Sequence, residues 1–140
     1  MSAGQYPRHW TSQKLKYVAS LQSGEGITSD DISDVGEYPV YGGNGVRGYT
    51  SSYTHDGTYP LIGRQGALCG NINYASGKFW ASEHAVVVSV HRNYVARWLG
   101  EVLRSMNLNQ YSQSAAQPGI SVEVIENLPI PVPPSQSRKP

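Results

Sequence analysis

Polar side chains that form hydrogen bonds are concentrated in three glycine-rich stretches of the 140-residue sequence, at residues 42–48, 63–66 and 70–77. Arginine suits guanine, asparagine and glutamine suit adenine, and lysine suits phosphate. Glycine turns also let a backbone approach a ligand closely. The stretches are therefore suited to binding a polymer, although ordinary hairpins with solvent-facing polar residues would have the same composition. The polar residues in these stretches, together with Tyr49 and Lys78 directly after two of them, are Asn44, Arg47, Tyr49, Arg64, Gln65, Asn71, Asn73, Tyr74 and Lys78.

Catalytic residue sets are difficult to assemble from this sequence. An enzyme needs a base, a nucleophile or a metal within reach of one another, and here the candidates occur singly. Glu83 and His84 are adjacent, but neighbours on a strand point to opposite faces, so they make a weak dyad. Residues 63–66 lack the lysine and spacing of a phosphate-binding loop, and Cys69 has no visible partner. We expect a chain without catalytic activity, and an enzyme using Glu83 and His84 is a minor alternative.

Composition narrows the class of protein further. The chain has 15 glycines, 10 tyrosines and a formal net charge of +1, so bulk positive charge alone would not bind DNA. The single cysteine argues against a disulfide framework and indicates a reducing compartment. Four dispersed histidines do not have the spacing of a zinc site. No apolar run of about 18 residues and no secretory pattern is present, so we expect a cytoplasmic location without membrane association.

Short strands separated by glycine turns dominate the middle of the sequence. Pro39 favours a sheet edge for the first strand. Three consecutive valines at 86–88 predict a strand that is buried on both faces. The expected strands cover residues 38–41, 46–49, 60–62, 67–74, 79–81 and 85–90.

An amphipathic helix is expected after the last buried strand. Apolar residues recur at three- and four-residue spacing between residues 95 and 106, with Asn93 as the expected N-cap. Gly100 should weaken this helix by about 1 kcal/mol relative to alanine. Ser121 is expected to cap a second, short helix that runs to Glu126. The other segments are expected to be a helical turn running into an edge strand at 10–23, an acidic loop at 24–36, a polar loop at 108–119 and, at 128–132, an edge strand or a polyproline-like segment.

Three longer segments, taken in order, resemble a known family. They are YPVYGGNGVRGY (38–49), LIGRQGALCGNINYASGKFWASEHAVVV (61–88) and LNQYSQSAAQPGISVEVIENLPIPVPP (108–134). Together they resemble the target-recognition domain of the specificity (S) subunit of type I restriction-modification enzymes, over residues 10–134. The resemblance implies an α+β fold with a twisted, mainly antiparallel β-sheet region and a few packing helices. Residues 1–9 would form an N-terminal tail, and 135–140 a C-terminal tail or the start of a missing spacer helix.

The resemblance also implies a function in sequence-specific recognition of double-stranded DNA. Such a domain reads one half of a split target and does no chemistry itself. Modification (methyltransferase) subunits, and through them the restriction subunit, would be its partners, and S-adenosylmethionine, ATP and magnesium are expected on those partners rather than on this chain. Because the spacer helix is missing, the chain could be a single domain of a longer subunit, a half subunit or a stand-alone reader. A half subunit could pair as a homodimer, but the resemblance implies that such pairing uses the missing helix. A carbohydrate-binding β module remains the alternative, because Tyr, Trp, Asn and Gly also suit sugars.

The residues expected at the DNA come from this resemblance and from the chemistry of their side chains. Arg64 and Gln65 lie in the turn that matches the family's Gly-Arg-x-Gly step, and we expect them at the DNA first. The second group, Asn44, Arg47 and Tyr49, belongs to the Gly-Gly-Asn-Gly turn and the strand after it. Weaker candidates for phosphate contacts or loop support are Lys78, Gln113, Ser114 and Gln117, and Asn71 and Asn73 complete the set.

Overall fold

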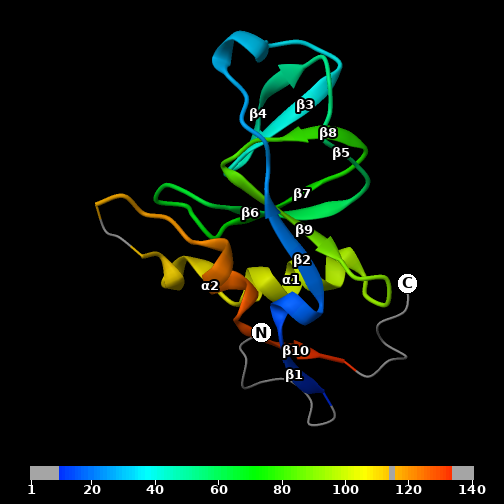
Figure 1. Ribbon diagram of the computed structural model, residues 1–140, viewed down its shortest axis with the longest axis vertical. Helices are drawn as coiled ribbons and strands as arrows, with labels where there is room; N and C mark the ends of the chain where they lie inside the picture. The colour runs from blue at the N-terminus through cyan, green and yellow to red at the C-terminus, as the bar shows by residue number, and fades with distance from the viewer. Residues whose placement is uncertain (1–9, 114–115, 134–140) are drawn as a thin grey trace.

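Two four-stranded sheets stacked along the long axis make up most of the structure (Figure 1). The computed structural model describes residues 10–113 and 116–133. The expected tails, residues 1–9 and 135–140, and the site candidate Ser114 lie outside the described residues. The sheets are mainly antiparallel and two α-helices pack beside them, which confirms the predicted α+β fold.

The sheet in the middle of Figure 1 is antiparallel throughout and carries the main core. Residues 86–88 lie on its second strand and are at most 1 % exposed, because α1 packs on one face and the other sheet on the opposite face. The prediction of a doubly buried strand is therefore confirmed. In sheet order the strands are β2 (Ala19–Ser23), β9 (Ala85–Val90), β6 (Tyr59–Gly63) and β7 (Ile72–Ala75).

Both helices appear, but only one has the predicted cap. Helix α1 (Ala96–Ser105) has Val95 as N-cap and no side-chain cap, so the prediction for Asn93 is wrong. The amide of Tyr94 donates to the carbonyl of His91, and this turn delays the start of the helix. Helix α2 (Val122–Glu126) begins as predicted, with the Ser121 hydroxyl accepting from the Val124 amide at 3.2 Å.

The upper sheet places Pro39 in an interior strand rather than at an edge. Strand β8 pairs in parallel with β3, but only at Val40 and Tyr41, so the ladder on that side begins after the proline and needs no amide from it. The prediction of an edge is therefore wrong. In sheet order the strands are β4 (Gly45–Thr50), β3 (Tyr38–Gly42), β8 (Lys78–Ala81) and β5 (His55–Asp56).

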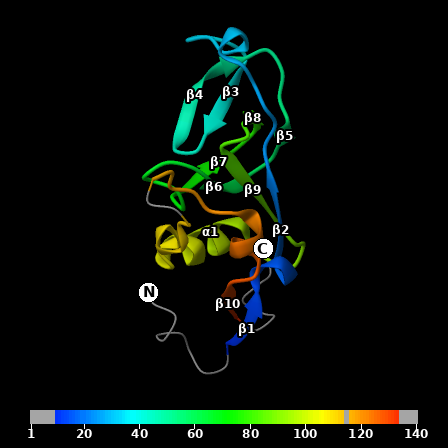
Figure 2. The same ribbon diagram turned by 60° about the vertical axis from the view of Figure 1, so that its left-hand side comes forward.

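A two-stranded sheet closes the lower end of the molecule, where β1 (Thr11–Lys14) pairs with β10 (Pro129–Val132) (Figure 2). β10 is the edge strand predicted from its prolines, whereas β1 lies where a helical turn was expected. The expected strand at 67–74 is shorter, because Gly66 and Gly70 have φ of +88° and turn the chain. Single 3₁₀ turns are η2 (Leu15–Tyr17), η3 (Ser29–Asp31) and η4 (Leu108–Tyr111).

Gly100 lets α1 pack closely on β7. A Cβ at this position would overlap the ring and hydroxyl of Tyr74. We therefore expect Gly100→Ala to destabilise the fold by about 1–3 kcal/mol through overpacking, despite alanine's higher helix propensity. Thermal melts test this prediction, and the same substitution should cost much less in a Tyr74→Ala background. A melting temperature raised by Gly100→Ala alone would contradict it.

Ionisation of the Tyr74 hydroxyl is expected to make the stability of the fold depend on pH in the alkaline range. Its hydroxyl donates to Glu101 Oε2 at 2.6 Å, and burial together with this bond raises the pKa of Tyr74 to about 12. The unfolded chain releases the proton near pH 10, so the stabilisation is complete below about pH 10 and is lost as pH rises through about 12. We expect chemical denaturation to show the stability advantage of the wild type over Tyr74→Phe shrinking across that range. A difference independent of pH would contradict this account.

Candidate nucleic-acid interface

Arg64 lies where the ends of several strands meet, directly after β6. Its backbone amide donates to the carbonyl of His84 at 3.0 Å, and its own carbonyl accepts from the amide of Ile120 at 2.9 Å. Its guanidinium Nη1 donates to Ser23 Oγ at 3.0 Å. One residue thus joins the end of β2, the β8–β9 turn and the segment before α2. The turn and loop residues at this end of the two sheets are referred to as the loop face: Ser23, Asn44, Arg64, Gln65, Asn71, Glu83, His84, Gln113 and Gln117.

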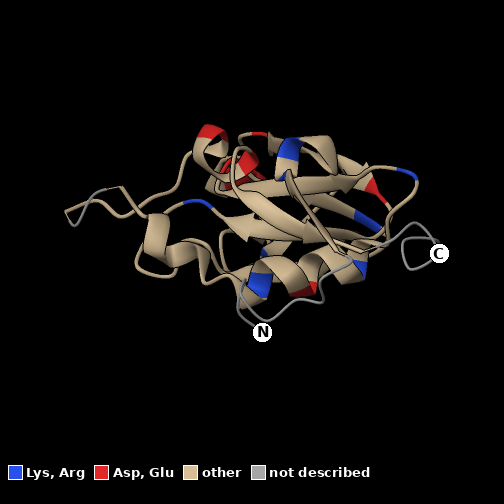
Figure 3. Ribbon diagram, turned by 90° about the horizontal axis from the view of Figure 1, so that it is seen from below, with Lys and Arg blue, Asp and Glu red and all other residues tan. Residues whose placement is uncertain are grey.

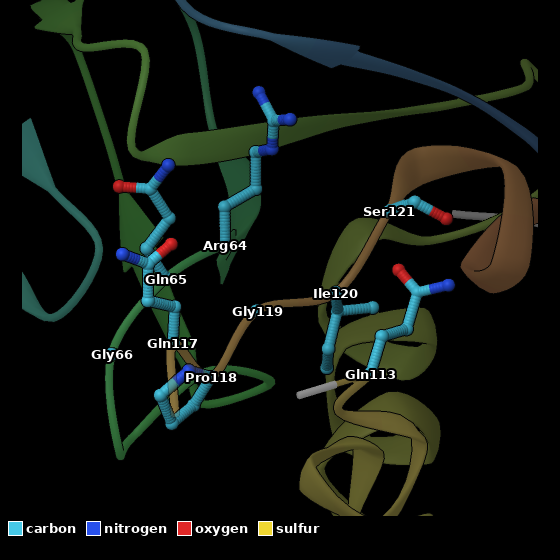
Figure 4. A pocket seen from close by; sticks show the side chains of 9 residues that line it. All are labelled: Arg64, Gln65, Gly66, Gln113, Gln117, Pro118, Gly119, Ile120 and Ser121. Carbon is cyan, nitrogen blue, oxygen red and sulfur yellow. The ribbon is translucent and has the colours of Figure 1, made fainter. Parts of the chain in front are cut away.

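A pocket of about 500 Å³ opens on the loop face beside Arg64 (Figure 4). Its walls come from two segments far apart in the sequence, since Gln65 forms a β-bridge with Gly119 and the amide of Gly66 donates to the carbonyl of Pro118. The structure therefore brings four predicted site residues to one pocket. The lining residues are Arg64, Gln65, Gly66, Gln113, Gln117, Pro118, Gly119, Ile120 and Ser121.

The β3–β4 turn adds a third segment to the loop face. Asn44 in this turn accepts a hydrogen bond through Oδ1 from Nδ2 of Asn71. The turn lies directly on the end of β6, because a Cβ added to Gly63 would overlap the carbonyl oxygen of Gly43. Only glycine at position 63 permits this approach. The stem of Arg47 lies across Gly42 beside the turn, so Arg47 is close to the loop face as well.

Three predicted site residues are not brought to the loop face. Tyr49 exchanges backbone hydrogen bonds with Ser33 in the acidic segment that covers β4. Lys78 begins β8 and so lies at the other end of the sheet from the β3–β4 turn, with its ammonium 5.2 Å from the centre of the Tyr53 ring. Asn73 is half-buried on β7. The geometry therefore gives these three residues no shared site with Arg64.

Glu83 and His84 occupy the turn between β8 and β9 and not a strand. The expectation that they point to opposite faces is therefore wrong, because a turn does not impose strand alternation. His84 Nε2 lies 3.8 Å from Glu83 Oε1, and the carbonyl of His84 is bonded to the amide of Arg64. The pair thus lies on the loop face beside Arg64.

Ser23 is a residue of the site that sequence reasoning missed. It is 41 positions from Arg64 in the chain, and nothing in its own segment marks it as a partner. It reaches the guanidinium because β2 pairs with β9, and β9 pairs with β6. Only the order of strands in the sheet could have identified it.

Lysines and arginines do not cluster on one element in the part of the chain that the structure describes. In Figure 3 the lysines and arginines are spread over the molecule, consistent with a net charge of +1. Across residues 10–113 and 116–133, no group of three His, Cys, Asp or Glu side chains is placed to hold a metal ion. Within the same residues, no helix has both the length and the apolar character needed to cross a membrane. The loop face therefore offers directed hydrogen-bonding groups in place of a basic stripe.

Comparison with known proteins identifies the family. Residues 7–139 match the family described as the type I restriction modification DNA specificity domain. The type I restriction enzyme EcoprrI specificity subunit of Escherichia coli is 45% identical over 123 residues, which are 85% of this chain and 31% of that protein. A putative type I restriction enzyme specificity subunit of Haemophilus influenzae is 32% identical over 102 residues, or 71% of this chain and 26% of that protein.

The fold agrees with a solved relative. The type I restriction-modification S subunit of M. genitalium superposes with a TM-score of 0.78 at 17% identity, over 87% of this chain and 34% of that one. The class defined by fold and sequence is thus a DNA specificity domain. The chain belongs to the type I restriction modification DNA specificity domain family, and it spans between about a quarter and a third of the length of its curated relatives. The resemblance seen in the sequence is confirmed, and the carbohydrate-binding alternative gains no support.

Proposed function

We propose that this chain reads a specific DNA sequence through its loop face and supplies one half-site of the split target of a type I restriction-modification assembly. The observation that carries the proposal is the convergence of segments on Arg64, which collects guanidinium and amide groups at one end of two sheets. These are the groups that distinguish base edges in the major groove. The family match supports the same function.

The charge distribution indicates how such recognition would work. Affinity that comes from neutralising phosphates needs many basic side chains and falls steeply with salt. With a net charge of +1 and dispersed basic residues, few phosphates can be neutralised at once. Directed contacts to bases would then supply the discrimination, and partner subunits would supply much of the affinity.

In this proposal, partner subunits in the cytoplasm carry out methyl transfer and DNA cleavage. The curated relatives are specificity subunits of restriction enzymes. Methyl transfer would be carried out by modification subunits that bind S-adenosylmethionine, and cleavage by a restriction subunit that uses ATP and magnesium. This chain would select the site at which they act.

Methylome sequencing tests the proposal. Cells that carry this gene together with the modification and restriction genes of its system should show a split methylated motif. Deleting the gene should remove that motif, and restoring it on a plasmid should bring the motif back. A motif that persists after deletion would contradict the proposed function.

A further inference from the structure

One hydrogen bond between two exposed side chains links two loops of the loop face. Asn71, at the end of the β6–β7 loop, donates from Nδ2 to Oδ1 of Asn44 in the β3–β4 turn. Water could satisfy both amides equally well, so a bond this exposed adds little to the stability of the fold. What the bond does is hold two amide groups next to each other at the surface.

The link leaves complementary groups on the two amides. Asn44 uses its oxygen, so its NH₂ group keeps its donors, whereas Asn71 uses its NH₂ group and keeps its oxygen as an acceptor. Adenine presents N7 as an acceptor and its N6 amino group as a donor in the major groove. A single asparagine side chain often forms hydrogen bonds to both of these adenine groups. Here one amide supplies the donor and the other the acceptor while the link stays intact.

We propose that the linked pair Asn44–Asn71 acts as one composite reader of an A·T base pair. The NH₂ group of Asn44 donates to N7 of adenine, and the oxygen of Asn71 accepts from the N6 amino group. This inference rests on the proposed function, because it requires DNA on the loop face. It adds the base pair that these two residues select.

Glycine turns beside both asparagines bring their side chains together, and the hydrogen bond between them positions the amides before DNA arrives. Gly45, which follows Asn44, has φ of +109°, and Gly70, which precedes Asn71, has φ of +88°. Other residues rarely adopt these angles. Groups that are already positioned lose less entropy on binding, so the pair is prepared for recognition.

The variant Asn44→Asp removes the group that would contact adenine but keeps the hydrogen bond that links the two loops. Its carboxylate still offers an oxygen to Nδ2 of Asn71, but it has no NH₂ group for N7 of adenine. Initial methylation rates of the assembled complex are measured on a set of duplexes, each of which differs from the target at one base pair. We expect the variant to lose its preference for the target base pair at a single A·T position and to keep the other preferences. The loss should be on the order of tenfold or more. Asn93→Asp introduces the same charge in the turn beyond β9 and should leave every preference unchanged.

The possible results distinguish failure of the composite reader from failure of the proposed function. If Asn44→Asp keeps the wild-type preference at every base pair, whether or not its overall rate falls, the pair selects no base, and the composite reader is overturned while the proposed function stands. A wild-type motif without an A·T pair would also overturn the composite reader. If the wild-type complex prefers no base pair at any position, the proposed function itself fails.

Discussion

Replacing Arg64 with alanine is expected to abolish methylation of the target by the assembled complex, or to reduce it to less than about a tenth of the wild-type rate. The substitution removes the only guanidinium at the centre of the loop face, and a bidentate arginine contact to guanine contributes about 1–3 kcal/mol of discrimination. The backbone hydrogen bonds of residue 64 to His84 and Ile120 remain. The melting temperature should therefore stay near that of the wild type, because the bond to Ser23 is the one side-chain hydrogen bond that Arg64 makes among the described residues.

Two variants make this prediction specific. Arg92→Ala removes an exposed arginine from the turn after β9, away from the loop face, and should leave methylation unchanged. Ser23→Ala keeps the guanidinium but removes its acceptor, so it should lower the rate less than Arg64→Ala. Full methylation by Arg64→Ala would remove this residue from the interface. Unfolding of that variant would show instead that its role is structural.

Gly63→Ala is expected to cause the second large effect, a loss of both stability and sequence discrimination. The added Cβ would overlap the carbonyl oxygen of Gly43, and backbone atoms cannot rotate away as a side chain can. The β3–β4 turn would then move off the end of β6 and carry Asn44 away from Asn71. We expect a destabilisation of about 1–3 kcal/mol, measured by thermal or chemical unfolding, together with a relaxed methylation motif.

Gly26→Ala is the matched control for this substitution. A Cβ there would meet only the carboxylate end of Glu83, at 3.3 Å, and a flexible side chain can shift. Its stability should stay within about 0.5 kcal/mol of the wild type. If Gly63→Ala melts like Gly26→Ala, the close approach of the β3–β4 turn to β6 does not exist in solution.

Local sequence signals predicted the elements whose causes are local. The valines at 86–88 form a strand buried on both faces, and Ser121 caps α2 through its own hydroxyl. The strand and the cap follow from residue type and from neighbours within a few positions, whereas α1 and the other sheet complete the burial of the valines. The prediction for Asn93 failed because the turn at residues 91–94 moved the start of the helix, which capping preference alone cannot reveal.

Long-range pairing explains what the sequence could not predict. Pro39 suggested a sheet edge, yet β8 joins β3 in parallel from a position about 40 residues away and pairs only beyond the proline. The same kind of contact creates the loop face. Gln65 and Gly119 are bridged although 54 positions separate them, and Ser23 reaches Arg64 through two strand pairings. Residue type identified Arg64 and Gln65 as candidates, but only the sheet order shows which other residues surround them.

Photocrosslinking tests the placement of DNA on the loop face most directly. A photoreactive amino acid is introduced at Gln65 in one sample and at Asn93 in another, and each assembled complex is irradiated with its methylated target duplex. Efficient crosslinking from position 65 and none from position 93 is the predicted result. Crosslinking from position 93 with none from position 65 would place the DNA elsewhere and contradict the account.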